Sequence, residues 1–129
     1  MNSHLRTGAA VVAGLIAWPV AASVGNLVLR QAFDGYRDTE PAMAFSITML
    51  IGRLAVGLAA SVASGVAARL VAGRPGPGPW IAGLMLFAAF VPVHLALWGR
   101  FPVAYHLFFL ASLVAVPPLS ARVVVSARR

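Results

Sequence analysis

The chain has 129 residues, of which 60% are hydrophobic and only 10% are charged. A soluble domain carries about 25% charged residues, so this composition, with a mean hydropathy of +0.88, leaves too few charges to cover a soluble surface. The net charge of +7 comes from arginines at the ends of apolar runs, not from a basic polar face, which argues against a nucleic-acid partner. The lack of cysteine excludes disulfides and thiolate chemistry.

Four apolar segments follow one another along the chain, at residues 8–29, 42–72, 80–98 and 101–121. Each reaches or nearly reaches the roughly 20 residues that a spanning helix needs. Trp80 and Trp98 bracket the third segment, about 27 Å apart along a helix, which is close to the ~30 Å thickness of the hydrocarbon core. The sequence therefore predicts an all-α fold, with residues 1–129 forming one membrane domain of four transmembrane helices in a bundle.

The first segment has a second interpretation, as a cleaved leader. A small basic head at residues 1–6 precedes it, and residues 20–23, Val-Ala-Ala-Ser, resemble a signal-peptidase site. Apolar character nevertheless continues to Leu29, and the total length suits a span better than the core of a leader. We therefore expect the segment to be retained.

The arginines near the segment ends predict the orientation, because cytoplasmic loops carry the excess of positive charge. One side has the acidic residues Asp34, Asp38 and Glu40 together with Arg30, Arg37 and Arg100. The other side has only basic residues, which are Arg6, Arg69, Arg74, Arg122, Arg128 and Arg129. We expect a multi-pass protein of the bacterial inner membrane with both termini in the cytoplasm.

Small residues recur at helical spacing in the first two segments. The rows are Ala17, Ala21 and Gly25 in the first and Gly57, Ser61 and Gly65 in the second. Such rows let helix backbones approach closely in lipid, where no hydrophobic force drives helices together. They fit a seam between these two helices, or a seam with a second copy of the chain or another membrane protein.

Polar side chains gather toward the side that carries the acidic loop. They are Asn26 and Arg30 in the first segment, Arg53 in the second, His94 in the third, and Tyr105 and His106 in the fourth. His94 and His106 flank the turn at residues 99–102 at similar distances, so an antiparallel hairpin brings them to one depth. The sequence predicts an outward-facing polar pocket around Arg53, His94 and His106.

Each of these residues has alternative roles. The histidines fit a metal site, a proton relay or pH sensor, or plain hydrogen bonding at helix ends, although no HxxxH or HExxH spacing supports a metal. Arg53 fits an anion or substrate site, or an ion pair with an acid of the outer loop. It also fits a position without function at the membrane–water interface, because its segment is longer than a bilayer requires.

Signatures of enzymes are missing. The chain has no Gly-x-Ser-x-Gly elbow, no paired acids within a span, and no Lys or Ser/Thr to make a P-loop of the Gly/Pro string at residues 73–79. We expect no enzymatic activity, no cofactor and no metal.

Several short motifs carry a resemblance across most of the chain. They are Trp18, the Gly25-Asn26 pair, Ala67-Ala68-Arg69-Leu70, and Phe101-Pro102-x-x-Tyr105-His106-Leu107. With them the chain resembles small uncharacterised four-span bacterial inner-membrane proteins, which implies a fold and a location but no activity.

Two classes of function follow. In the first, the protein is an accessory or structural membrane protein that acts through helix–helix association, with itself or with a membrane-protein partner. In the second, it is a small transporter, channel or lipid-handling protein that uses the polar pocket. The lack of membrane-embedded acids, the commonest proton-coupling groups, favours the first class.

Overall fold

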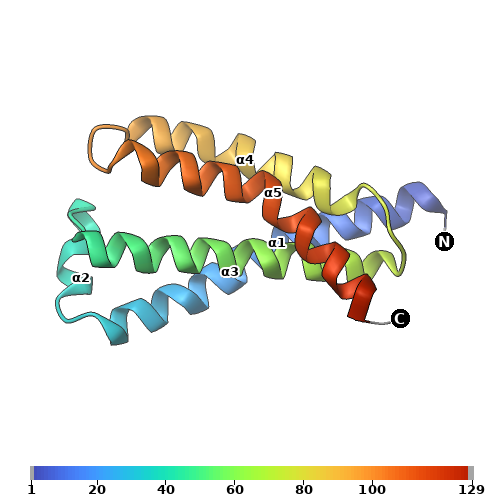
Figure 1. Cartoon of the computed structure of the whole chain (residues 1–129), viewed down its shortest axis with the longest axis horizontal. Coiled ribbons are helices and arrows are strands. Elements are labelled where there is room, and N and C mark those ends of the chain that lie inside the picture. Colours follow the sequence, from blue (N-terminus) through green and yellow to red (C-terminus); the bar gives the residue numbers. More distant parts are fainter. Residues whose placement is uncertain (1, 128–129) are drawn as a thin grey trace.

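Four long helices form a bundle in the computed structural model, which describes residues 2–127 and side chains as far as residue 124. The long helices are α1 (Ser3–Ala32), α3 (Ile47–Ala72), α4 (Gly78–Ala96) and α5 (Val103–Ala127). Between α1 and α3 the chain makes a short helix, α2 (Tyr36–Thr39), and one 3-10 turn, η1 (Glu40–Ala42). The predicted all-α four-helix bundle is confirmed (Figure 1).

The bundle has two distinct ends (Figure 1). The α2 end carries α2, η1 and the α4–α5 turn, and Arg100 of that turn donates a hydrogen bond to the Ala42 carbonyl, 2.9 Å away. The loop end carries the start of α1, the Gly/Pro loop between α3 and α4, and the end of α5. All three acidic residues lie in residues 34–40, so they belong to the α2 end.

Local chemistry explains where the helices begin and end. Asn2 and Ser46 cap the starts of α1 and α3, where their side-chain oxygens accept from backbone N–H groups. Gly73 ends α3 with φ of 71°, a left-handed conformation that suits glycine. The second helix starts at Ile47 and not at the predicted residue 42, because Met43 turns left-handed and residues 44–46 are extended or irregular.

Small residues hold α3 against its neighbours inside the chain. A Cβ added to Gly25 would collide with the Val56 side chain, and one added to Gly57 would collide with the Phe109 ring. One added to Gly65 would overlap the Pro117 carbonyl oxygen. Gly25, Gly57 and Gly65 of the predicted rows therefore pack within the bundle, where they let α3 approach α1 and α5 closely.

A pair of prolines, Pro117 and Pro118, lies inside α5. Proline lacks a backbone N–H, so the carbonyls of Leu113 and Val114, four residues earlier, lose their helical partners. Gly83 of α4 faces these carbonyls, and a Cβ there would lie 2.6 Å from the Leu113 oxygen. This glycine lets α4 pack closely against the interrupted part of α5.

All four long helices are long and apolar enough to cross a membrane. Their outer faces expose large apolar side chains, for example Ile16 and Val24 on α1 and Leu107 on α5. A soluble protein rarely exposes such wide apolar faces, whereas lipid covers them readily.

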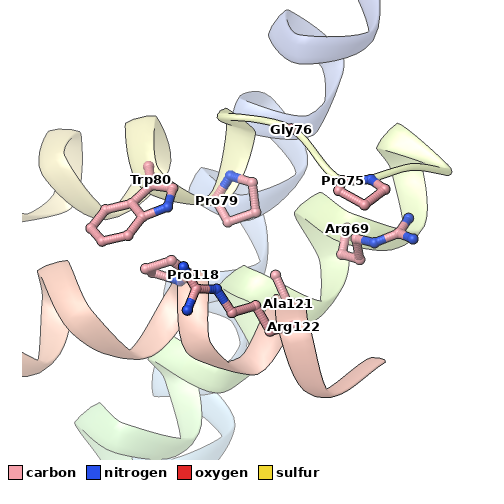
Figure 2. A pocket seen from close by; sticks show the side chains of 8 residues that line it. All are labelled: Arg69, Pro75, Gly76, Pro79, Trp80, Pro118, Ala121 and Arg122. Atoms are coloured by element: carbon pink, nitrogen blue, oxygen red, sulfur yellow. The ribbon is translucent and has the colours of Figure 1, made fainter. Parts of the chain in front are cut away.

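The loop end is hollowed beneath the Gly/Pro loop. A cavity of about 210 Å³ lies there between α3, α4 and α5, with Arg69, Pro75, Trp80, Pro118 and Arg122 in its lining. Figure 2 shows the Arg122 guanidinium turned toward Trp80 and Pro118, whereas the Arg69 guanidinium extends beneath Pro75.

Candidate functional site

The segment between α1 and α3 folds back over the α2 end. Gly35 makes this possible with φ of 77°, and the chain then turns into α2. Tyr36 points inward and is only 1% exposed, and the rings of Phe33 and Phe45 stack with it at 6.4 and 5.1 Å between centroids. This aromatic roof covers the polar interior of the bundle end.

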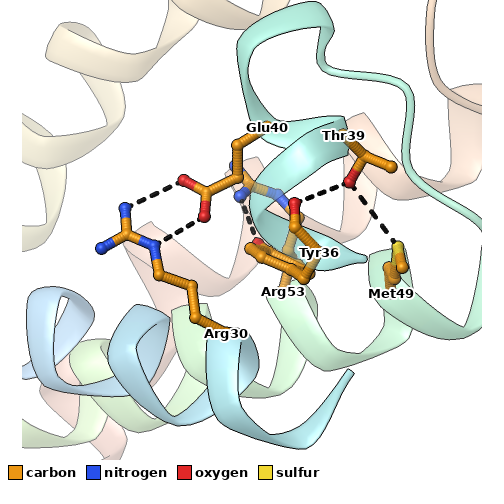
Figure 3. Close-up of polar contacts among 6 residues, drawn as sticks. All are labelled: Arg30, Tyr36, Thr39, Glu40, Met49 and Arg53. Atoms are coloured by element: carbon orange, nitrogen blue, oxygen red, sulfur yellow. Dashed lines mark hydrogen bonds and ion pairs between the residues drawn. The ribbon is translucent and has the colours of Figure 1, made fainter. Parts of the chain in front are cut away.

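Arg53 lies beneath this roof. Its Nη1 donates a hydrogen bond to the Tyr36 hydroxyl at 2.9 Å (Figure 3). Its Cζ lies 4.5 Å from the centroid of the Phe45 ring. Its Nε is buried and has no hydrogen-bond partner. Helical side chains lean toward the helix start, which explains why the guanidinium reaches toward α2. It meets neutral groups there.

The nearest acid is taken by another arginine. Arg30 donates two hydrogen bonds to Glu40, from Nε at 2.6 Å and from Nη2 at 2.9 Å (Figure 3). These hydrogen bonds lower the pKa of the Glu40 carboxyl, with desolvation opposing the shift and Coulomb attraction to Arg30 reinforcing it. Within residues 2–127 the structure contains this one ion pair between side chains. Arg53 makes no ion pair there, and it acts on the Glu40 carboxylate only by Coulomb attraction over a longer distance.

A cavity of about 250 Å³ lies next to Arg53. Polar groups enter it from three helices, namely Asn26 of α1, Arg53 of α3 and Tyr105 of α5. The rest of the wall is apolar, and half of its residues are aromatic, namely Trp18, Phe90 and Phe109. All four long helices contribute residues to its wall.

His94 and His106 form a separate pair. Their Nδ1 atoms lie 2.8 Å apart, and the side chains are 5% and 0% exposed. The Trp98 indole stacks on His106 at 4.7 Å between centroids, and the Phe109 ring packs against His94 at 4.7 Å. Among the described residues no group of three His, Cys, Asp or Glu side chains could hold a metal ion.

The structure thus divides the predicted pocket into three groups at one end of the bundle. Arg53, Asn26 and Tyr105 line the cavity, the two histidines pair with each other, and Arg30 binds Glu40. The rings of His94 and Tyr105 lie 6.1 Å apart, so Tyr105 links the first two groups. Whether any of these residues binds a ligand stays a prediction.

Sequence reasoning missed the partners of Arg53. Tyr36 and Phe45 lie in a stretch expected to be a loop and the beginning of a span, and nothing in their spacing points to Arg53. Trp18 was noted only as part of a motif, yet its indole lines the cavity and donates a hydrogen bond to Ser61 at 3.1 Å. The only hint in the sequence is that an arginine inside an apolar segment often packs against an aromatic ring.

The fold and its apolar surface define the chain as a small all-α membrane protein with four membrane-spanning helices. Family models, curated proteins and solved structures all fail to match it. The predicted resemblance to four-span bacterial proteins therefore gains no support beyond the fold itself.

Proposed function

We propose that this membrane protein binds a small organic anion with an apolar body in the Arg53 cavity, as a transporter or lipid-handling protein does. One observation carries the proposal: a cationic side chain on the wall of a half-open cavity makes no ion pair with an acidic side chain among the described residues.

The depth of Arg53 makes its charge significant. The 26 residues of α3 span about 39 Å, which exceeds the ~30 Å hydrocarbon core by only about 9 Å. Arg53 lies six residues after Ile47, so even if all the excess projects at the α2 end, Arg53 reaches no farther than the edge of the hydrocarbon. Because Tyr36 and Phe45 roof it, water does not replace a counter-ion freely. An anionic ligand compensates this charge.

The cavity lining indicates the kind of anion. The guanidinium of Arg53 offers paired donors that suit a carboxylate or phosphate, and the Asn26 amide and Tyr105 hydroxyl add neutral hydrogen-bonding groups. The aromatic lining residues Trp18, Phe90 and Phe109 suit an aromatic or branched apolar body. A small aromatic carboxylate combines both features within about 250 Å³.

Location and orientation follow the sequence. We place the protein in a bacterial inner membrane with the loop end in the cytoplasm, because arginines without acids gather at that end. The Arg53 cavity then lies toward the outer surface. A reaction on the ligand is not part of the proposal, since no nucleophile with an adjacent base lines the cavity.

The accessory role favoured by the sequence is the second candidate. Its small-residue seam is occupied within the bundle, but α1 is the least buried of the four spans and presents a continuous apolar stripe. Val12, Ile16 and Val20 are each more than half exposed on this stripe. A partner helix or a second copy of the chain that packed there would serve this role.

Binding of 4-nitrobenzoate tests the first candidate, with Trp18 as the reporter. In protein with Trp80→Phe and Trp98→Phe, reconstituted in nanodiscs, the probe should quench Trp18 saturably. Arg53→Gln should weaken binding about tenfold or more, the loss expected for a charge-assisted pair. Arg37→Gln is the matched control, because it removes the same charge from an exposed site at the same end.

Nitrobenzene, which lacks the carboxylate, should bind alike with and without Arg53. Equal affinity of the Arg53→Gln and Arg37→Gln proteins for 4-nitrobenzoate, with both folded, would overturn the proposal. Uptake of the probe into proteoliposomes then separates a transporter from a protein that only binds.

A further inference from the structure

The loop end holds a second cationic cavity that shares no residue with the Arg53 cavity. Two arginines from different helices line it, Arg69 from α3 and Arg122 from α5. Arg69 is unusual because its side chain lies at the last turn of a spanning helix and is only 8% exposed. A terminal arginine normally extends into water, so this burial needs an explanation.

Arg69 is also incompletely satisfied. Its Nε is buried and has no hydrogen-bond partner. The acidic side chains of the chain all lie at the far end of the bundle, so none of them reaches Arg69. A buried guanidinium with a free donor is costly unless an acceptor binds it.

The start of α4 adds positive potential to the same cavity. Pro79 and Trp80 of its first turn line the cavity. This turn contains no acidic residue, and the N-cap residue Pro77 provides no side-chain hydrogen bond. The partial positive charge of a helix start is therefore not offset by any side chain here.

The cavity is open on its apolar side. Trp80 is 46% exposed, and Pro118 and Ala121 of α5 continue the apolar wall beside it. Indoles concentrate at the level of lipid headgroups, where one end of the ring is apolar and the other is wet. Figure 2 shows the Arg122 guanidinium directed toward this indole, so charge and apolar surface meet in one place.

We propose that this cavity binds the phosphate-bearing headgroup of an anionic phospholipid. The Arg122 guanidinium faces the phosphate, and Arg69 adds its positive charge from the α3 side of the cavity. Trp80, Pro118 and Ala121 contact the glycerol and the first carbons of the acyl chains. The apolar wall favours a lipid over free phosphate, because free phosphate leaves that wall unused. The site is independent of the anion cavity at the α2 end.

Native mass spectrometry of the purified protein in neutral detergent tests the proposal. The probes are phosphatidylglycerol, phosphatidylcholine and inorganic phosphate. Phosphatidylglycerol should form retained adducts that phosphatidylcholine does not. Arg69→Gln should weaken them about tenfold, whereas Arg74→Gln should change them less than twofold. Arg74 is the matched control because it is an exposed arginine of the same end that does not line the cavity.

A second variant protects the test against misfolding of Arg69→Gln. Ala121→Leu fills the cavity and keeps both arginines, and it should weaken the phosphatidylglycerol adduct as well. The Arg53→Gln protein should retain the adduct. If millimolar inorganic phosphate displaced the phosphatidylglycerol adduct, the cavity would be a site for phosphate, and the proposal that a lipid occupies it would be overturned. Equal adducts with both lipids, or no effect of Arg69→Gln and Ala121→Leu, would overturn the proposal entirely.

Discussion

The Nδ1 atoms of His94 and His106 lie 2.8 Å apart in the interior of the α4–α5 hairpin. Two imidazole nitrogens can approach this closely only when one carries a proton and the other presents its lone pair, so the two rings adopt complementary tautomers. The Nε2 atom of His106 is buried and has no hydrogen-bond partner. The main hydrogen bond of each imidazole is therefore the one that it makes with the other imidazole.

This pairing predicts non-additive effects of mutation. His94→Leu leaves His106 with both nitrogens unpaired in the core, which should cost about 1–3 kcal/mol and lower the unfolding midpoint by several degrees. The double variant His94→Leu/His106→Leu should be more stable than either single variant, because no orphaned polar group remains. His4→Leu, at an exposed position, is the control. Thermal unfolding in detergent measures all four, and additive losses would show that the rings act independently.

Gly65 gives a prediction about where the small-residue row acts. Gly65→Ala puts a methyl group against the Pro117 carbonyl and the Ser120 hydroxyl, which should force α3 and α5 apart and cost about 1–3 kcal/mol. Gly8→Ala is the control, because a Cβ there meets nothing within 4 Å. The unfolding midpoint of Gly65→Ala should fall, while the molecular mass measured by light scattering stays constant. A change of oligomeric state at unchanged stability would mean that this row joins subunits.

The sequence predicted the number of helices because length and apolarity alone determine a span. It also predicted that His94 and His106 lie at one depth, since both flank one short turn between antiparallel helices. The small-residue rows were recognisable as well, and a seam between the first two helices was one expected use of them. The packing of Gly57 and Gly65 against α5 was not expected. A row of glycine and alanine fits any helix that approaches closely, so spacing cannot distinguish a neighbour in the chain from another subunit.

The partners of Arg53 depend on a fold-back that spacing does not encode. Gly35 and Met43, both left-handed, turn residues 33–46 over the bundle end and place Tyr36 above the guanidinium. The sequence left open an ion pair between Arg53 and an acid of this segment. In the structure Glu40 instead faces Arg30, which belongs to the helix that leads directly into the segment.

The Arg30–Glu40 pair predicts a loss of stability in acid. Arg30 lowers the pKa of Glu40 below its ordinary value of 4.5, so the pair stabilises the fold fully above about that pH. The contribution disappears as the pH falls through the lowered pKa of the folded state. The difference in unfolding midpoint between wild type and Glu40→Gln should therefore shrink as the pH falls below the ordinary Glu value and through the lowered pKa of Glu40.

Asp34→Asn provides the control for this titration, because Asp34 is exposed in the same segment and outside the ion pair. Its difference from wild type should not follow the Glu40 curve. A gap between wild type and Glu40→Gln that stays constant down to pH 3 would mean that the pair contributes nothing to the fold.

The indole of Trp18 joins the core to the Arg53 cavity, which yields a last prediction. Its N–H donates to the buried Ser61 hydroxyl at 3.1 Å, and Ser61→Ala removes the only acceptor shown for it. Hydrogen bonds between membrane helices contribute about 0.6 kcal/mol on average and up to about 1.7, so the unfolding midpoint should fall modestly. Ser112→Ala is the matched control, because the buried Ser112 hydroxyl donates to the Phe109 carbonyl of its own helix.

Fluorescence distinguishes the loss of this hydrogen bond from a general loosening of the bundle. With Trp80 and Trp98 replaced by Phe, Trp18 emission should shift to the blue in Ser61→Ala and stay unchanged in Ser112→Ala, because only the first removes a polar partner of the excited indole. The affinity for 4-nitrobenzoate should fall with the same variant, since a freed indole no longer holds the cavity wall in place. Equal emission and equal affinity in the two serine variants would show that the Trp18–Ser61 hydrogen bond does not contribute to binding in the Arg53 cavity.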